Sequence, residues 1–65
     1  MTKVTKPKVK LVGEDGNVFN LIGICSRALK QAGQRENSEQ MTRECFSAES
    51  YDHALQIMMK YCNIT

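Results

Sequence analysis

The segment VFNLIGICSRALKQA (residues 18–32) decides the fold that this sequence predicts. Its apolar side chains recur every three or four residues, which is the spacing of one face of an α-helix, and they cover an arc of about 120°. The members of this stripe are Val18, Leu21, Ile22, Cys25, Ala28, Leu29 and Ala32. Asn17 is a favourable N-cap, and Gly33 stands where a left-handed glycine ends a helix. We therefore expect a helix over residues 18–32.

A half-buried strand is expected before this helix. Residues 8–12 (KVKLV) alternate lysines with apolar residues, which places Val9 and Leu11 toward the core and the lysines toward water. Exposed lysines also discourage a strand from pairing with another molecule. The cluster GEDGN at residues 13–17 then predicts a structural turn, because Asp, Asn and Gly favour turns and no phosphate-binding glycine motif is present.

A second and weaker helix is expected to begin within residues 36–38, with Asn37 or Ser38 as its N-cap. Its apolar side carries Met41, Cys45 and Ala48. Phe46 points away from that side, which indicates a bend or an end near Ser47.

Ser50 is expected to cap a third helix over residues 51–61, with Asp52 complementing the positive end of the helix dipole. The apolar stripe of this helix is Tyr51, Ala54, Leu55, Met58, Tyr61 and Cys62. Residues 62–65 either form a short strand beside residues 8–12 or fray.

These elements predict an α+β fold in the order strand–helix–helix–helix, with a possible short C-terminal strand and the helices packed on a small two-stranded sheet. The 65 residues and 7.4 kDa allow one small domain, which we place at residues 8–65 with residues 1–7 as a flexible basic arm. Because two short strands add little stability in water, we also predict a homodimer that buries Phe19 or extends the strand edge.

Charge and hydropathy exclude several classes of protein. No apolar run approaches the roughly 18 residues of a membrane span, and no apolar segment of a signal peptide follows the first lysines. The formal charge is +2, but residues 1–10 hold four lysines and no acid, while residues 11–65 hold five basic and seven acidic side chains. The expected body is slightly acidic, and its excess positive charge lies on a short arm.

The cysteines Cys25, Cys45 and Cys62 fall in apolar stretches at separations that do not suggest a disulfide framework. Free cysteines favour a cytoplasmic location. No Cys-x-x-Cys pair is present to hold half of a zinc site, so we expect neither a metal nor another cofactor.

His53 is the only histidine, and its neighbour Asp52 diverges from it on a helix. The expected role of His53 is therefore at the surface or at a helix cap. Because no set of catalytic side chains converges, we do not expect an enzyme and assign no catalytic residue.

Phe19 and Gly23 lie one turn apart and off the stripe of the first helix. In one interpretation Phe19 folds back over the strand and Gly23 permits another element to approach. In the other, the two residues form a second, smaller apolar surface for a partner chain.

A basic strip offers an alternative function. No acid occurs between residues 17 and 35, so the first helix presents basic side chains that together with the arm could meet a phosphate backbone. The candidate nucleic-acid contacts are Lys3, Lys6, Lys8, Lys10, Arg27 and Lys30. Residues 36–61 read as a helix-turn-helix would instead bring the carboxylate of Asp52 to the groove, which disfavours that reading.

The patterns GxDGNxFxLxG (residues 13–23) and YDHxLQ (residues 51–56) resemble those of small uncharacterised proteins encoded by bacteria, bacteriophages and other mobile elements. The similarity spans roughly residues 9–62. It implies a bacterial or phage cytoplasmic origin and carries no activity, so it assigns no catalytic or binding residue.

Two classes of function remain from the sequence. The first is a small interaction module that binds a protein partner, and the second is an accessory nucleic-acid-binding protein that uses the lysine arm and the first helix.

Overall fold

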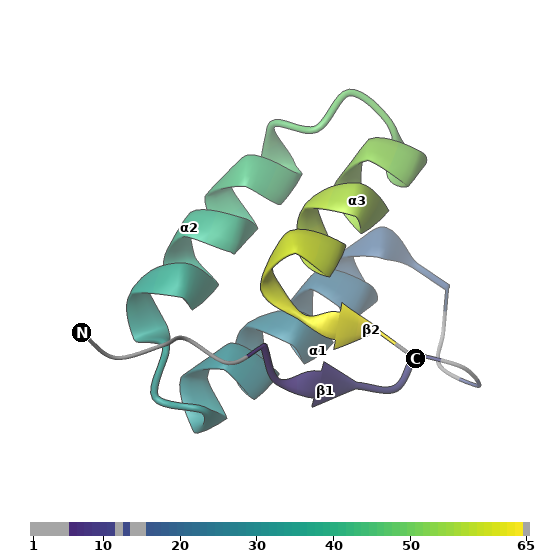
Figure 1. Cartoon of the computed structure of the whole chain (residues 1–65). Helices are drawn as coiled ribbons and strands as arrows, with labels where there is room; N and C mark the ends of the chain where they lie inside the picture. Colours follow the sequence, from purple (N-terminus) through teal and green to yellow (C-terminus); the bar gives the residue numbers. More distant parts are fainter. Residues whose placement is uncertain (1–5, 12, 14–15, 65) are drawn as a thin grey trace.

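The computed structural model describes residues 6–11, 13 and 16–64 and has the α+β order that the sequence predicts. A short strand precedes three helices, and a second short strand follows them (Figure 1). The elements are β1 (Lys8–Val9), α1 (Val18–Gln31), α2 (Arg35–Phe46), α3 (Tyr51–Tyr61) and β2 (Asn63–Ile64).

The starts of α1 and α3 are set by the predicted caps. The side-chain oxygen of Asn17 accepts a hydrogen bond from the Phe19 amide at 2.8 Å. The Ser50 hydroxyl accepts one from the His53 amide at 3.1 Å. Each cap satisfies an amide that the helix itself leaves without a partner.

The predicted start of α2 is wrong. The helix begins at Arg35, and its N-cap residue Gln34 makes no side-chain capping bond. Ser38 is fully buried inside the helix instead of capping it, with its hydroxyl oxygen 2.5 Å from that of Ser26 on α1. Asn37 donates a side-chain hydrogen bond to Gln34 at 3.0 Å. Gly33, in the turn before α2, has φ +77°. This left-handed residue ends α1, and the next helix begins only two residues later, at Arg35.

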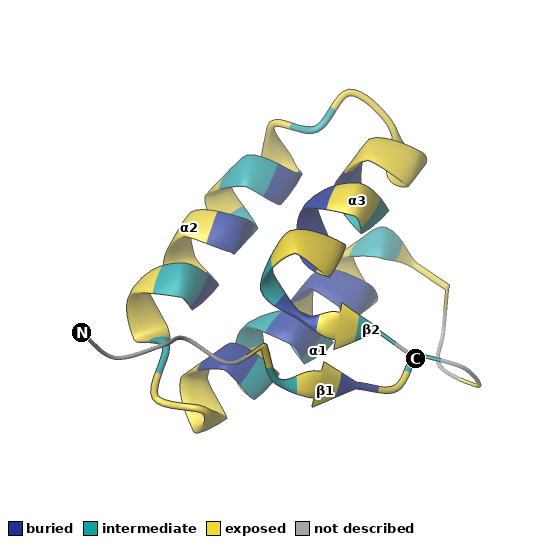
Figure 2. Ribbon diagram, in the orientation of Figure 1, coloured by how far each residue is buried: buried dark blue, intermediate teal, exposed yellow. Residues whose placement is uncertain are grey.

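The core lies where the three helices meet beside the sheet (Figure 2). Its fully or nearly fully buried apolar residues are Val9, Leu21, Ile22, Cys25, Leu29, Met41, Cys45, Ala54, Ile57, Met58 and Cys62. Burying these side chains removes apolar surface from water, which stabilises the fold by about 25 cal/mol per Å² of surface buried.

Three core assignments differ from the sequence prediction. Ala32 is exposed, because α1 ends one residue earlier and the chain turns away. Tyr51 is 47% exposed, and its hydroxyl donates to the Gly16 carbonyl at 2.6 Å. Ile57 is buried although it lies outside the expected stripe. The reason is that α3 packs against both α1 and α2, which widens its buried face.

The two strands are parallel and pair Lys8 with Asn63 and Val9 with Ile64. β1 is shorter than the predicted strand: Leu11 lies half-buried beyond it, and Val12 is outside the described residues. The short C-terminal strand is confirmed at residues 63–64.

The boundary of the predicted arm falls at a point where the chain already contacts the body. The Asn63 amide donates to the Pro7 carbonyl at 2.9 Å, and the Lys6 amine donates to the Met59 carbonyl at 3.0 Å. Residues 1–5 of the predicted arm lie outside the described residues.

A side-chain bond joins α3 to α2. The Tyr61 hydroxyl donates to a carboxylate oxygen of Glu44 at 2.6 Å. This bond, followed by burial, raises the pKa of Tyr61 to about 12. The same bond lowers the pKa of Glu44. Both shifts favour the neutral hydroxyl and the ionised carboxylate.

Within the described part of the chain, each helix is too short or too polar to cross a membrane.

Two glycines give opposite predictions for stability. Gly33 has φ +77°, whereas Gly23 lies inside α1, and a Cβ added to either meets no atom within 4 Å. Gly33→Ala should lower the free energy of unfolding by about 1 kcal/mol through backbone strain alone. Gly23→Ala should raise it by about 0.5–1 kcal/mol. Urea unfolding of both variants measures the pair, and shifts of the same sign would contradict this description of the turn.

The Tyr61–Glu44 bond predicts a pH-dependent difference between the wild type and Tyr61→Phe. Because the folded pKa of Glu44 lies below its usual 4.5, the stability that the bond contributes is present above pH 4.5 and is lost as the pH falls through the folded value. Because the folded pKa of Tyr61 is raised from 10.0 to about 12, the contribution is complete below pH 10.0 and is lost as the pH rises from there through about 12.

Denaturant unfolding between about pH 3 and pH 9 measures this difference. The wild type should be the more stable protein at neutral pH, and its advantage over Tyr61→Phe should shrink in acid. An advantage that is constant throughout would show that the bond does not form in solution.

Candidate interaction surface

The cysteines are placed for packing and not for chemistry. All three are free and buried. Burial, followed by the proximity of Cys62, raises the pKa of the Cys25 thiol to about 12, and burial also raises the pKa of Cys45 and Cys62. The Cys62 thiol donates to the Cys25 carbonyl, and the Cys45 thiol donates to the Ala54 carbonyl, both at 3.8 Å. Because the thiolate is the reactive form, the raised pKa values disfavour reaction of these thiols at neutral pH.

His53 lies exposed at the start of α3, as the helical wheel predicts. Its Nδ1 atom accepts a hydrogen bond from the Glu49 amide at 3.3 Å, so it supports the turn before the helix. The carboxylate of Asp52 accepts from Gln56 at 3.1 Å. No group of three His, Cys, Asp or Glu side chains within residues 6–11, 13 and 16–64 is placed to hold a metal ion.

The most unusual feature of the surface is a pair of exposed aromatic rings. Phe19 near the start of α1 is 65% exposed, and Phe46 at the end of α2 is 62% exposed. The ring centroids lie 5.7 Å apart with the planes tilted by 38°. This is the separation of a favourable aromatic contact, so each ring covers part of the other while both stay open to water.

Gly23 lies on the same outer face of α1, one turn beyond Phe19. The interpretation in which Phe19 folds over the strand is wrong, because the ring contacts Phe46 instead. Gly23 is exposed, and a Cβ built on it meets no atom of the described residues within 4 Å, so none of them makes a close approach there. Phe19, Gly23 and Phe46 together are called the aromatic patch below. A shallow hollow of about 350 Å³, lined also by Ile24 and Arg27, opens beside Phe19 and Gly23.

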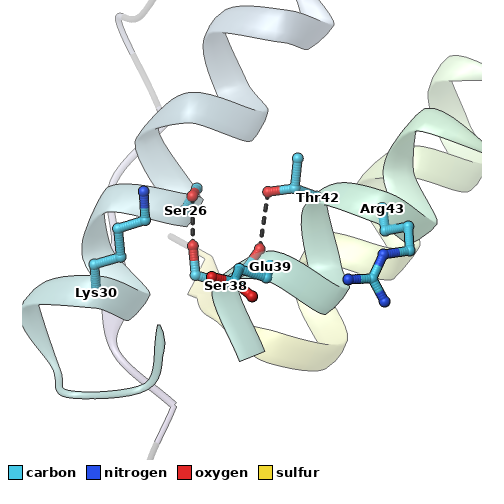
Figure 3. A pocket seen from close by; sticks show the side chains of 6 residues that line it. All are labelled: Ser26, Lys30, Ser38, Glu39, Thr42 and Arg43. Atoms are coloured by element: carbon cyan, nitrogen blue, oxygen red, sulfur yellow. Dashed lines mark hydrogen bonds between the residues drawn. The ribbon is translucent and has the colours of Figure 1, made fainter. Parts of the chain in front are cut away.

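A polar hollow of about 370 Å³ lies farther along the seam between α1 and α2 (Figure 3). The hydroxyls of Ser26 and Ser38 bond to each other across it, and Thr42 donates to the Ser38 carbonyl at 2.8 Å. Lys30, Glu39 and Arg43 complete the lining. The Ser26 and Ser38 hydroxyls join α1 to α2, and the Thr42 hydroxyl bonds within α2. Charges of both signs line the hollow, so it shows no preference for an anion or a cation.

The basic residues of the predicted nucleic-acid interface fall into separate places. Lys8, Lys10 and Arg27 line one groove of about 240 Å³ between β1 and α1. Lys30 lines the polar hollow, which Glu39 also lines. The Lys6 amine is engaged by the Met59 carbonyl, and Lys3 is outside the described residues. Among the predicted contacts that the structure describes, Lys8, Lys10 and Arg27 are the three that share one groove.

Phe46 is the member of the aromatic patch that the sequence did not assign. Its position off the stripe of α2 was the available signal, but only the antiparallel course of α1 and α2 brings it to Phe19.

Comparison with protein-family models, curated proteins and solved structures gives no match for this chain.

Burial of the three thiols predicts how they react with an aromatic disulfide reagent. The native protein should react slowly, and all three thiols should react once denaturant is added. Phe46→Cys is the matched control, because it places one thiol at an exposed position and should add a single fast phase. Fast reaction of the wild-type thiols under native conditions would contradict the buried arrangement.

Proposed function

We propose that this protein is a small interaction module that binds a protein partner through the aromatic patch, and not an enzyme. The observation that carries the proposal is the contact between Phe19 and Phe46, two large aromatic side chains that are each more than 60% exposed. A cytoplasmic location is part of the proposal, because three unpaired cysteines are suited to a reducing compartment.

The aromatic patch exposes apolar surface that folding leaves in contact with water, and a partner that covers this surface gains its burial free energy. Most of the large apolar side chains of the described chain are buried or half-buried. An exposed aromatic pair is different, because aromatic side chains supply much of the affinity at protein interfaces when a partner removes them from water. At about 25 cal/mol per Å², covering both rings yields a favourable contribution that the free protein lacks.

The surroundings of the rings also suit a protein partner. Gly23 carries no side chain, so the hollow beside Phe19 is open to a side chain from outside. Arg27 stands at the far end of that hollow and supplies a charged, bidentate hydrogen-bond donor. An apolar anchor with a polar rim is the usual anatomy of an interface centre.

A nucleic acid is the second candidate, and the cluster of Lys8, Lys10 and Arg27 in one groove favours it. Two facts disfavour it: Lys30 lines a different hollow, which also holds an acidic residue, and residues 11–65 carry a net negative charge. Titration with duplex DNA at two salt concentrations separates the candidates. Binding that weakens steeply with salt supports the nucleic-acid function, and its absence supports the protein-binding function.

The homodimer stays a prediction. Two rings alone fall short of the roughly 800 Å² per partner that a stable interface buries, so a dimer through the patch has to involve neighbouring surface as well. Sedimentation at micromolar concentration tests it: a mass near twice the 7.4 kDa of the chain supports a dimer, and 7.4 kDa contradicts it.

The test of the proposed function uses three immobilised proteins: the wild type, the double variant Phe19→Ala/Phe46→Ala, and Met59→Ala. Met59 is the matched control, because it is 55% exposed on α3 and lies outside the patch. A bacterial lysate is the source of partners, since a bacterial origin is what the family resemblance implies. Circular dichroism first checks that all three proteins are folded.

The wild type and Met59→Ala should retain the same proteins, and the double variant should lose them by at least about tenfold, which corresponds to 1.4 kcal/mol. Retention of the same proteins by all three, or of none by the wild type, would contradict a binding role for the patch.

A further inference from the structure

The two-stranded sheet leaves one edge of β1 without a strand. The sheet consists of β1 and β2 in the described residues. The bond from the Asn63 amide to the Pro7 carbonyl and the register of the pair direct the backbone of residues 7 and 9 toward β2. Since alternate residues of a strand direct their amide and carbonyl groups to opposite sides, those of Lys8 point toward the other edge, and Lys10 follows the strand by one residue. This free edge is a template for one more strand.

The outer edge of β2 is less suitable. The Cys62 amide, which precedes that strand, is used by the Met58 carbonyl at the end of α3 at 2.8 Å. The available edge in the described part of the chain is therefore that of β1.

A groove runs between the free edge of β1 and the side of α1. Its volume is about 240 Å³, and its lining residues are Lys8, Val9, Lys10, Ile24, Arg27, Ala28 and Gln31. Three of these residues are cations and none is acidic. Ile24 and Ala28 are half-buried and provide an apolar floor, while Lys8 and Lys10 are exposed. The groove thus combines unpaired strand backbone, an apolar floor and uncompensated positive charge.

We propose that the free edge of β1 binds an extended acidic segment of a partner protein as a third strand of the sheet. In such a complex the main-chain hydrogen bonds give affinity, and the alternating side chains give specificity. One set of side chains faces α1 and packs on Ile24 and Ala28, so apolar residues suit it. The other set lies beside Lys8 and Lys10, so carboxylates suit it, with Arg27 at the wall of the groove.

Charge selects this occupant over a second copy of the chain. A second β1 paired on the same edge would place its own Lys8 and Lys10 against the first pair, and like charges opposite one another destabilise a strand pair. The same lysines disfavour pairing of two β1 strands at this edge and favour a segment of opposite charge. This contact goes beyond the proposed function: the groove shares Ile24 and Arg27 with the hollow beside Phe19 but uses neither aromatic ring, so either contact can fail alone.

The test uses a synthetic probe: a short peptide of alternating glutamate and valine, blocked at both ends and labelled with a fluorophore. Fluorescence anisotropy measures its binding to the full chain. The expected result is saturable binding that is absent for the matching peptide of alternating lysine and valine. Amide chemical shifts of Lys8 and Lys10 should change on binding.

Two N-methylated versions of the probe separate strand addition from simple charge attraction. One carries methyl groups on all valine amides and the other on all glutamate amides. Because only alternate amides of an added strand face β1, one version should lose at least about tenfold in affinity while the other binds like the parent. Equal binding of both methylated probes, or no binding of the parent probe, would overturn the proposal.

Protein variants complete the experiment. Lys8→Glu/Lys10→Glu should lose at least about tenfold in affinity for the probe, whereas the control Arg35→Glu/Lys60→Glu, the same change of net charge on exposed residues of α2 and α3, should not. Phe19→Ala/Phe46→Ala should bind the probe normally, which distinguishes failure at this edge from failure at the aromatic patch. Equal affinities of the two charge variants would place the binding elsewhere and contradict the proposal.

Discussion

The inner face of α1 is the constraint on which the rest of the structure depends. Cys25 and Leu29 on this face are fully buried, and α1 contacts α2, α3 and β1. A chain of this size buries only about 60% of its unfolded surface, so a single well-covered helix face has to supply a large share of its stability. Each fully buried large side chain contributes about 1.5–3 kcal/mol. The positions of α2, α3 and β1 follow from their packing against this face.

Much of the fold was predictable because its determinants are local. The stripe of α1, the caps Asn17 and Ser50, and the alternation that buries Val9 are all readable from spacing and residue type. The start of α2 was not, because Ser38 is needed for a buried bond to Ser26, and a partner twelve positions away leaves no local pattern. Ile57 was missed for a similar reason, since a helix packed on two neighbours buries a wider arc than one packed on a single neighbour.

The candidate sites were predictable only in part. Phe19 and Gly23 could be identified as misfits to the stripe, and the structure keeps both at the surface. The contact of Phe19 with Phe46 depends on how α1 lies against α2. The packing of the elements also divides the described basic residues among the groove, the polar hollow and the Met59 carbonyl. With the inner face of α1 occupied by the core, the outer face offers two chemically distinct surfaces: aromatic at its first turn, and cationic beside the strand.

The central claim is that the buried face of α1 stabilises the fold, whereas Phe19 and Phe46 contribute little to folding stability. The most direct measurement compares the free energies of unfolding of Leu29→Ala and Phe19→Ala/Phe46→Ala in urea. Leu29→Ala should lose about 2–5 kcal/mol or fail to fold, because it opens a cavity at a fully buried site. The double variant should lose about 1 kcal/mol or less, since it gives up only one exposed aromatic contact. A loss in the double variant equal to that of Leu29→Ala would show that the aromatic pair belongs to the core and would contradict the account.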